Sequence, residues 1–474
     1  MTVIAESLSK NSGAITKYLG LFLACLILFW VGLMGAEYPA YILFPVTAVI
    51  FTLICLDNLK NALVLMVFLV PIMPNSIVLP LGSGSSSVFL YRILMLIVLV
   101  VFFSGLLTRL YKFEWSIYHL AGYFFIAVTM INVIASFQPY SSLKFAFNEL
   151  WIPGVLFFFV SFHLTSSPEY AEKLIKAALY AAIVISVLGF YEFLTGNSIE
   201  MSWLVDFFCP YKDEIFPNGW GRGLNLRGGM PRAQATLRHP LGMASYLMFL
   251  FPLAMEYAAR NKGKWLWFLT VSAGLFVTLS RAGLFLAGAV LGVKSRRNPI
   301  VVIGMFVVIM MVIVPFYQSA GEKGGNLLML ADDSSTLSRF VRLENGIKVF
   351  KMYPLTGVGI GQLDIEVFDM FRYRSGDVTI AALLEETGIL GVAGWFTFFI
   401  VFTVKMFGFV RRKENKIRWA AMGMSAAMVI SLISAMVSNS IFQYGQAYIV
   451  MMVLAGSLAR LEWDSANKRT PEIK

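Results

Sequence analysis

Long apolar segments alternate with short polar connections along almost the whole chain. A helix needs ~20 predominantly apolar residues to cross a bilayer, where every backbone polar group must be paired within the protein. The pattern predicts an all-α integral membrane protein with about fourteen transmembrane helices. Because several segments are short, a count of about twelve or thirteen stays open. The expected spans are residues 18–36, 39–56, 61–79, 87–107, 117–135, 150–165, 174–195, 240–259, 264–280, 282–294, 299–317, 388–410, 417–437 and 441–461.

Basic residues are concentrated in alternate connections between these segments. Cytoplasmic loops carry an excess of Lys and Arg, and this bias sets the orientation of a membrane protein. The intervening connections are nearly free of charge, for example GSGSSS at 82–87. The pattern predicts a multi-pass protein with both termini in the cytoplasm. The basic connections hold Lys60; Arg109 and Lys112; Lys173 and Lys176; Arg260, Lys262 and Lys264; Lys294, Arg296 and Arg297; and the segment from Arg411 to Arg418.

Two connections on the outer side are long. Loops of this length usually carry function or are disordered, and both contain aromatic and apolar stretches. We therefore expect them to form short amphipathic helices on the outer membrane surface. They divide the chain into a cytoplasmic N-terminus (1–17), N-terminal membrane helices (18–195), a first outer loop (196–239), central membrane helices (240–317), a second outer loop (318–387), C-terminal membrane helices (388–461) and a cytoplasmic tail (462–474).

Composition agrees with a membrane protein and narrows its chemistry. Of all residues, 58% are hydrophobic and 14% charged, whereas soluble domains are about 45–50% apolar and about 25% charged. The net charge of +11 comes mainly from the basic connections, so we expect no nucleic-acid partner. The three cysteines and the scattered histidines suggest neither a disulfide framework nor a metal site, and we expect no cofactor. The run GVGIGQ at 357–362 lacks the lysine of a nucleotide-binding loop and indicates a tight turn instead.

The segment GRGLNLRGGMPRAQATLRHP contains four arginines and no carboxylate. It falls in the first outer loop, where the basic bias predicts few arginines. A guanidinium group donates bidentate hydrogen bonds and keeps its charge, which suits a phosphate or pyrophosphate. The segment therefore predicts an anion site, for a phosphorylated lipid headgroup, at Arg222, Arg227, Arg232 and Arg238.

Three further arginines lie on the predicted outer side. Arg281 lies in the sequence SRAG between two spans, where an ionisable group is costly and is a functional candidate; snorkelling to headgroups or capping a helix end is the alternative. Arg339 and Arg342 precede the sequence YPLTGVGIG at 353–361. We expect all three to contribute to the same anion site.

Two other side chains have open roles. His239 adjoins the outer arginines and either accepts a proton or caps the helix that starts at Pro240. Arg92 lies near the outer end of its span and either snorkels to the headgroups or reaches the same cavity as the outer arginines.

Four motifs follow one another along residues 230–440: Arg238 to Gly242, Ser280 to Gly283, Arg342 followed by Pro354 to Gly361, and Glu386 to Gly391. Together they resemble the O-antigen ligase and polysaccharide polymerase superfamily of bacterial membrane glycosyltransferases. The resemblance implies an undecaprenyl-pyrophosphate-linked glycan donor held by outer-face arginines, which match Arg281 and Arg342 here. It also implies transfer of the sugar chain to an acceptor hydroxyl with inversion, without a nucleotide sugar or a metal.

The chain departs from this family at one position. Ligases of the family usually carry a histidine nine residues before the glutamate of the last motif, where this chain has Asp377. A carboxylate can still deprotonate or orient an acceptor hydroxyl. The departure favours a polymerase of capsule, exopolysaccharide or O-antigen repeats over an O-antigen ligase.

We therefore expect a polymerase of lipid-linked repeat units on the outer face of the bacterial cytoplasmic (inner) membrane. The alternatives are an O-antigen ligase and, from another class, a secondary transporter of an anionic solute or lipid. Expected partners are the lipid-linked oligosaccharide donor, a glycan acceptor, membrane lipids, and a chain-length regulator or other polysaccharide assembly proteins. The catalytic candidates are Asp377 and His239, and the candidate pyrophosphate ligands are Arg281, Arg342, Arg238, Arg232 and Arg339.

Overall fold

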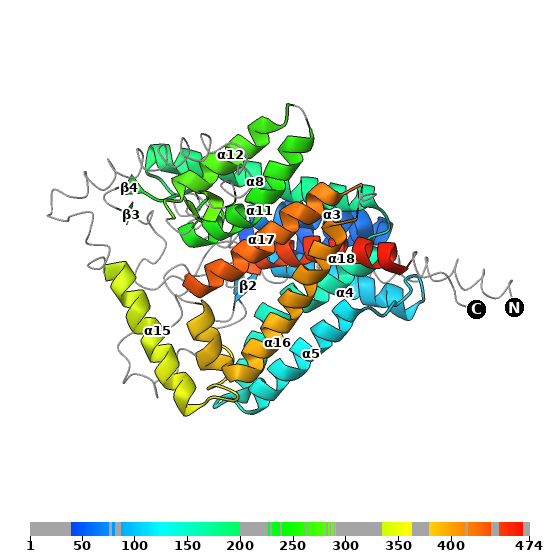
Figure 1. Ribbon diagram of the computed structural model, residues 1–474. Helices are drawn as coiled ribbons and strands as arrows, with labels where there is room; N and C mark the ends of the chain where they lie inside the picture. Colours follow the sequence, from blue (N-terminus) through cyan, green and yellow to red (C-terminus); the bar gives the residue numbers. More distant parts are fainter. Residues whose placement is uncertain are drawn as a thin grey trace, which may run out of the picture.

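Long helices run side by side through the described part of the chain (Figure 1). Seven of them are long and apolar enough to cross a membrane, and three further apolar helices are shorter. The described part is therefore that of a helical membrane protein, as predicted. The expected spans at 18–36 and 299–317 lie outside it, so the count of about fourteen stays a prediction. The computed structural model describes residues 39–74, 78–80, 87–199, 226–227, 230–237, 239–261, 263–280, 283–284, 286–288, 290, 334–362, 379–412, 416–437 and 445–467.

The first helices follow the expected spans closely. Asn58 caps the second of them, because its side chain accepts a hydrogen bond from Asn61 N at 3.1 Å. A short antiparallel hairpin pairs Val78 with Phe89 in the connection predicted to be uncharged. The elements are α2 (Pro39–Asp57), α3 (Leu59–Ile72), β1 (Val78–Pro80), β2 (Ser87–Phe89), α4 (Leu90–Leu107) and α5 (Ile117–Ile134).

The next span starts earlier than expected. It runs from Pro139 to Leu164, rather than over 150–165, and comprises α6 (Pro139–Phe145), the π-helix η1 (Ala146–Leu156) and α7 (Phe157–Leu164). Proline suits the first turn of a helix, where its missing N–H has no intrahelical acceptor, and here it starts α6. Glu149 consequently lies well inside this helix and not in the connection before it.

Helix α8 (Pro168–Thr195) also starts before its expected span. Ser167 caps it by accepting a hydrogen bond from Tyr170 N at 3.3 Å. It ends at Gly196, whose φ of 71° is the left-handed conformation that glycine adopts without a Cβ clash.

The remaining elements are β3 (Leu226–Arg227), β4 (Met230–Pro231), α11 (Pro240–Arg260), α12 (Trp265–Val277), α15 (Ser334–Met352), α16 (Thr379–Val410), α17 (Arg418–Val437) and α18 (Gly445–Asn467). Helix α16 starts inside the predicted second outer loop and is broken at Gly388, whose φ is 58°. Helix α18 continues six residues into the predicted tail, where Arg460 pairs with Asp464 at 3.1 Å on successive turns of the helix.

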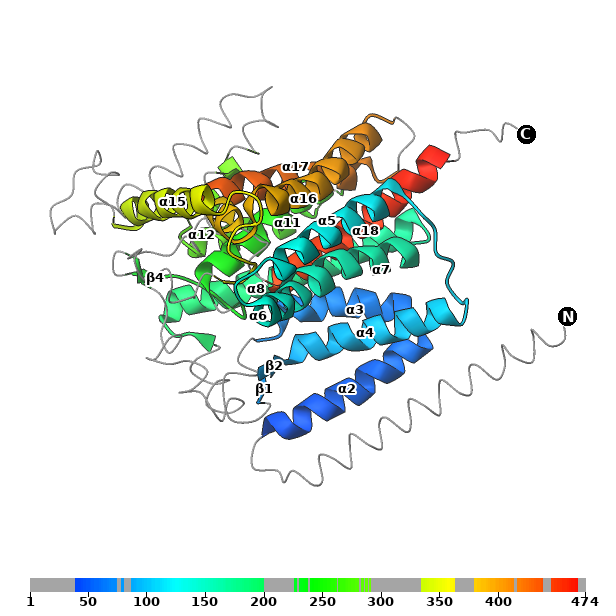
Figure 2. The same cartoon turned by 90° about the horizontal axis from the view of Figure 1, so that it is seen from below.

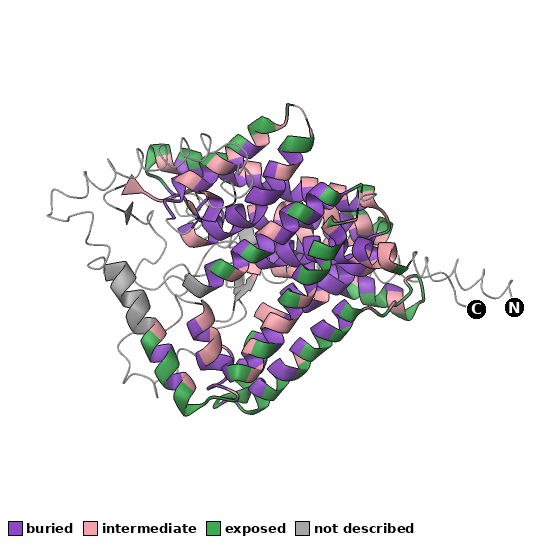
Figure 3. Cartoon of the chain, viewed as in Figure 1, coloured by how far each residue is buried: buried purple, intermediate pink, exposed green. Residues whose placement is uncertain are grey.

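Two helices form the centre of the bundle. Helices α11 and α18 are buried along most of their length (Figure 3). Helix α18 packs against α3, α7, α8, α16 and η1. By contrast, α4 exposes a stripe of apolar side chains at helical spacing, Leu96, Val100, Phe103 and Leu107. A continuous exposed apolar stripe is unfavourable in water and suits a surface that faces lipid.

Polar contacts between distant segments gather at opposite ends of the bundle. One end carries β1, β2, β4 and α15, and we call it the motif end (Figure 2). The opposite end carries the α4–α5 connection and the C-terminus of α18, and we call it the basic end. There Lys60 bonds to Ser166 at 2.9 Å and Arg260 pairs with Glu172 at 3.7 Å. This division matches the alternation of basic connections; which end faces the cytoplasm stays a prediction.

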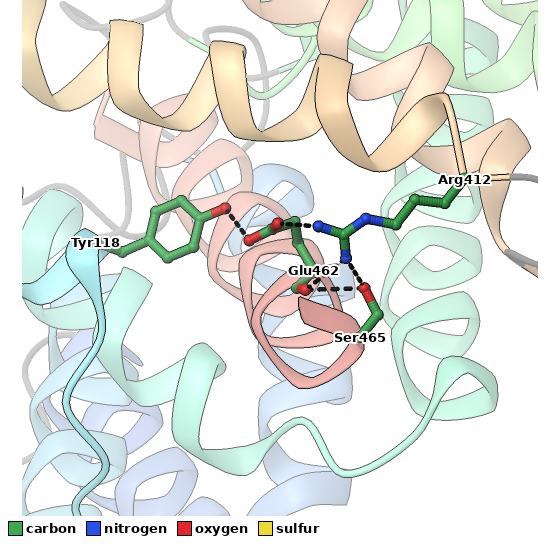
Figure 4. A network of polar contacts seen from close by, with 4 residues as sticks. All are labelled: Tyr118, Arg412, Glu462 and Ser465. Atoms are coloured by element: carbon green, nitrogen blue, oxygen red, sulfur yellow. Dashed lines mark hydrogen bonds and ion pairs between the residues drawn. The ribbon is translucent and has the colours of Figure 1, made fainter. Parts of the chain in front are cut away.

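A buried polar network ties three elements together at the basic end (Figure 4). Glu462 of α18 accepts a hydrogen bond from Tyr118 Oη of α5 at 3.0 Å and pairs with Arg412, which follows α16, at 2.9 Å. Arg412 also donates to the hydroxyl of Ser465. A buried carboxylate requires partners of this kind, because desolvation of an unpaired charge is costly. The network holds α5, α16 and α18 together.

Candidate functional site

Glu192, near the end of α8, anchors the arginine-rich segment at the motif end. Its side chain is fully buried. One carboxylate oxygen accepts hydrogen bonds from the backbone N–H groups of Gln234 at 2.9 Å and Ala235 at 2.7 Å, and the other accepts one from Ile199 at 3.0 Å. We call residues 231–237 the arginine turn. Glu192 therefore fixes the backbone of the arginine turn against α8.

The arginine turn, which precedes the first motif, also contacts the end of α12, which precedes the second. Ala233 N donates to Val277 O at 3.1 Å, and Arg232 Nε donates to Thr278 O at 3.0 Å. The next residues form the serine-led motif. Ser280 starts a helical turn there, because its hydroxyl accepts from Gly283 N at 3.3 Å. Arg238, which follows the arginine turn, and Arg281, which follows Ser280, lie outside the described residues.

His239 caps α11. Its Nδ1 accepts a hydrogen bond from Leu241 N at 3.1 Å, which is one of the two roles that the sequence left open. A neutral imidazole that accepts at Nδ1 carries its proton on Nε2. In this arrangement His239 can take up a proton only by giving up the cap. The other two histidines lie at the basic end, where His119 Nε2 and His163 Nε2 are 3.1 Å apart.

The end of α3 joins the same cluster. Pro71 and the helix end leave backbone carbonyls without intrahelical donors. Thr236 of the arginine turn donates to Pro71 O at 2.7 Å. Gln446, at the start of α18, donates to Val70 O at 2.9 Å and to Met73 O at 2.6 Å. The arginine turn is thus held by α3 as well as by α8 and α12.

The third and fourth motifs interlock through their backbones. The break of α16 at Gly388 leaves backbone groups on both sides of it without helical partners. The loop after α15 supplies them: Val358 N donates to Glu385 O at 3.0 Å, and Ile389 N donates to Pro354 O at 2.9 Å. The glycine-rich run therefore pairs with the broken helix.

Glycine is required at this junction by space as well as by conformation. A Cβ at Gly357, whose φ is 64°, would lie 2.4 Å from the backbone carbon of Glu386. A Cβ at Gly388 would lie 2.5 Å from the backbone of Leu355. Both contacts are shorter than any side chain tolerates, and both backbones adopt the left-handed region. The prediction of tight turning and close approach is confirmed for this run.

Asn132, near the end of α5, clamps the two motifs. Its Nδ2 donates to Thr356 O and to Thr387 O, both at 2.7 Å, and the side chain is fully buried. Gln362 donates to Ser142 of α6 at 3.0 Å. The junction therefore rests on α5 and α6, whose sequences gave no functional signal.

Helix α15 places Arg339 and Arg342 in a regular helix, although the structure does not describe their side chains. Its C-terminal half packs on α16, where a Cβ at Gly346 would lie 3.1 Å from that of Ala381. The exposed face carries an ion pair between Glu344 and Lys348 at 2.8 Å, and the lysine hydrogen bond lowers the pKa of the Glu344 carboxyl. A helix therefore lies within the predicted second outer loop, and its position on the outer membrane surface stays a prediction.

Arg92 has a partner that the sequence did not indicate. It forms an ion pair with Glu149 of η1, and its guanidinium lies 5.1 Å from the centre of the Phe89 ring. About a quarter of the arginine side chain and a third of the glutamate side chain are exposed (26% and 32%). The pair was not predicted, because the expected span began at residue 150 and Glu149 fell just before it. The pair of Arg92 with Glu149 could be anticipated only if η1 were predicted. π-Helices often mark functional sites.

The candidate residues are thus only partly described. At the motif end the structure joins the third motif to the fourth, and it joins the arginine turn before the first motif to the residues just before the second. Asp377, the family-derived base candidate, lies outside the described residues, as do Arg238 and Arg281. Sequence reasoning missed Glu192 and Asn132. Each is an isolated polar residue near the C-terminal end of an apolar span, and that position was the only available signal.

A search of protein-family models with this sequence finds no match, and a search of curated proteins finds no similar protein.

Proposed function

We propose that the chain is a membrane glycosyltransferase that polymerises lipid-linked oligosaccharide repeat units at the motif end. One observation carries the proposal: the third and fourth motifs pair through their backbones at the motif end, and the arginine turn that precedes the first motif contacts Val277 and Thr278, which precede the second. Arginines in or beside these motifs supply the charge that a pyrophosphate requires. Of the described helices, the central ones are apolar, which suits a donor with a long lipid tail.

The proposed chemistry needs few groups. The arginines Arg281 and Arg342, assisted by Arg232, Arg238 and Arg339, bind the pyrophosphate of the donor. The acceptor hydroxyl oxygen attacks the anomeric carbon, its proton passes to Asp377, and the bond from that carbon to the pyrophosphate oxygen breaks with inversion. Preorganised guanidinium groups stabilise the charge that develops on the leaving pyrophosphate.

Reconstitution tests this proposal directly. Purified protein in liposomes, given an undecaprenyl-pyrophosphate-linked repeat unit, should produce longer glycans and free undecaprenyl pyrophosphate. The reaction should need neither nucleotide nor ion gradient, and EDTA should leave the rate unchanged. Transfer to an acceptor other than a lipid-linked glycan would identify a ligase with the same donor site. Failure to consume the donor with every acceptor class would overturn the proposal.

Arginine substitutions test the donor site. Arg281→Ala and Arg342→Ala should each lower the polymerisation rate by roughly 10²–10³, the range measured for loss of one charge-stabilising donor. Lysine at either position should restore only part of the rate, because it keeps the charge but loses the planar fork. Protein abundance and melting temperature should stay near wild type. Normal polymer yield from both alanine variants would place the site elsewhere.

A secondary transporter is the second candidate, and two observations favour it. Transporters often contain broken helices and ionisable groups inside the membrane. Here α16 is broken at Gly388, and Arg92 pairs with Glu149 within helices α4 and η1. Gradient-driven uptake of an anionic solute into liposomes, with no change in glycan length, would select the transporter.

A further inference from the structure

We propose that Glu192 is a positioning residue: its buried carboxylate fixes the arginine turn in the conformation that binds the donor pyrophosphate. This inference rests on the proposed function, because it assumes an anionic donor at that turn. Glu192 itself binds no substrate in this view. It acts through the backbone of residues 234 and 235.

The geometry is that of a carboxylate bound by main-chain donors. The N–H groups of Gln234 and Ala235 are consecutive and meet the same oxygen of Glu192, at 2.9 Å and 2.7 Å. Ala235 has a φ of 48°, a left-handed conformation that is unfavourable for alanine. Charge-assisted bonds of this kind are stronger than neutral ones. They offset the cost of the strained residue and keep the arginine turn in one shape.

The arrangement also restricts how the turn can bind an anion. Two adjacent N–H groups form a concavity that could itself hold a phosphate oxygen. In this chain Glu192 occupies it, and the carboxylate is fully buried. Anion recognition by the turn therefore falls to side chains. Arg232 belongs to the same turn, and its Nε donates a hydrogen bond to Thr278 O at 3.0 Å.

Two physical effects of Glu192 have opposite signs, and this makes the inference testable. Removing a buried negative charge near an anion site should strengthen anion binding by reducing Coulomb repulsion. Releasing the turn should weaken binding, because the arginine geometry is lost. If Glu192 acts through position, replacing it lowers the affinity for an anion. If it acts only through charge, the same change raises the affinity.

The experiment compares two ligands and two Glu192 variants. Full-length protein in detergent is titrated with farnesyl pyrophosphate, and with farnesol as the uncharged control. Glu192→Gln keeps the shape but presents an amide to N–H donors. Glu192→Asp keeps the charge but shortens the reach. Positioning predicts that both variants bind farnesyl pyrophosphate more weakly, on the order of tenfold, with farnesol binding unchanged. Hydrogen exchange should rise at residues 231–237.

Two matched variants control for a general loss of stability. Tyr246→Phe removes a buried hydrogen bond between α11 and α8, from Tyr246 Oη to Ala178 O at 3.1 Å. This bond does not involve the arginine turn. Ser161→Ala removes a buried hydrogen bond away from the turn, from Ser161 Oγ of α7 to Val453 O of α18 at 2.6 Å. Both should bind farnesyl pyrophosphate like wild type, even at an equal loss of melting temperature.

The outcomes separate this inference from the proposed function. Unchanged or tighter pyrophosphate binding by the Glu192 variants would overturn the inference alone, and so would equal weakening in Tyr246→Phe. A wild-type protein that binds no prenyl pyrophosphate would overturn the proposed function and the anion role of the turn together. If Glu192→Gln does not fold, the result for Glu192→Asp decides.

Discussion

At the scale of single residues, His239 illustrates how a local backbone role competes with a catalytic one. Its Nδ1 is engaged with Leu241 N at 3.1 Å, as the side chain of a helix cap. Asparagine is among the best capping residues and has no titratable group near neutral pH. We therefore expect His239→Asn to keep both the melting temperature and the polymerisation rate, whereas His239→Ala should lower stability by about 1 kcal/mol.

The two variants separate the roles cleanly. If His239 is the general base, His239→Asn loses activity although the cap survives, and thermal unfolding in detergent will show no matching loss of stability. A pH–rate profile adds a check, because loss of an essential base would remove the limb that the base produces.

A second residue, Asn132, is predicted to matter for the architecture of the site. Asn132→Leu removes two hydrogen bonds and leaves the carbonyls of Thr356 and Thr387 unpaired. Each buried unpaired group costs about 1–3 kcal/mol. Ser425→Ala is the control, since the Ser425 hydroxyl is bonded only to Ala421 O in its own helix, at 2.8 Å. A lower melting temperature and faster hydrogen exchange at 353–362 should appear in the Asn132 variant alone; equal behaviour of the two would contradict the clamp.

How far the candidate site follows from sequence differs by residue type. Arginines in a connection that is predicted to lie outside stand out against the loop bias, so the sequence marks the arginine-rich segment as a candidate, and its anion role stays a prediction. Glu192 and Asn132 could not be anticipated, because their roles depend on backbone groups 42 to 255 residues away. No local pattern encodes such contacts, and only the folded bundle shows them.

At the scale of elements, helix boundaries were predictable where the chain marks them. Helix α11 begins at Pro240 and α8 ends at Gly196, as proline at the first turn and glycine after the last turn would indicate. The π-helix η1 and the break at Gly388 were not anticipated, although both lie in or beside apolar runs. Hydropathy measures only composition, and it cannot distinguish a straight helix from an interrupted one.

Close helix packing gives a test at this scale. A Cβ at Gly456 of α18 would lie 2.2 Å from the backbone oxygen of Phe158 in α7, whereas a Cβ at Gly408 of α16 would meet nothing within 4 Å. Gly456→Ala should therefore separate two helices and lower stability by about 1–3 kcal/mol. Gly408→Ala should be neutral or stabilising by up to ~1 kcal/mol, because alanine favours helix. Thermal unfolding of both variants in one detergent decides, and an equal effect would show that the α7–α18 contact is looser than described.

At the scale of the whole molecule, the polar side chains divide by end. At the basic end, ion pairs such as Arg412 with Glu462 and Arg260 with Glu172 join different segments of the chain. The motif end is built largely from side chains that satisfy backbone groups, as Glu192, Asn132 and Gln446 do. This asymmetry suits a protein in which one end anchors the bundle and the other holds loops in a defined shape.

The same division predicts the accessibility of each end across the membrane. Asn197, just beyond α8, is exposed at the motif end, and Lys416, just before α17, is exposed at the basic end. In a chain with Cys25, Cys55 and Cys209 replaced by serine, a cysteine introduced by Asn197→Cys should react with an impermeant maleimide in right-side-out vesicles. The one introduced by Lys416→Cys should react only in inside-out vesicles, because basic connections stay in the cytoplasm. Reaction of both from the same side would contradict the two-ended arrangement, and the reverse pattern would turn the motif end toward the cytoplasm and remove the basis for an outer-face enzyme.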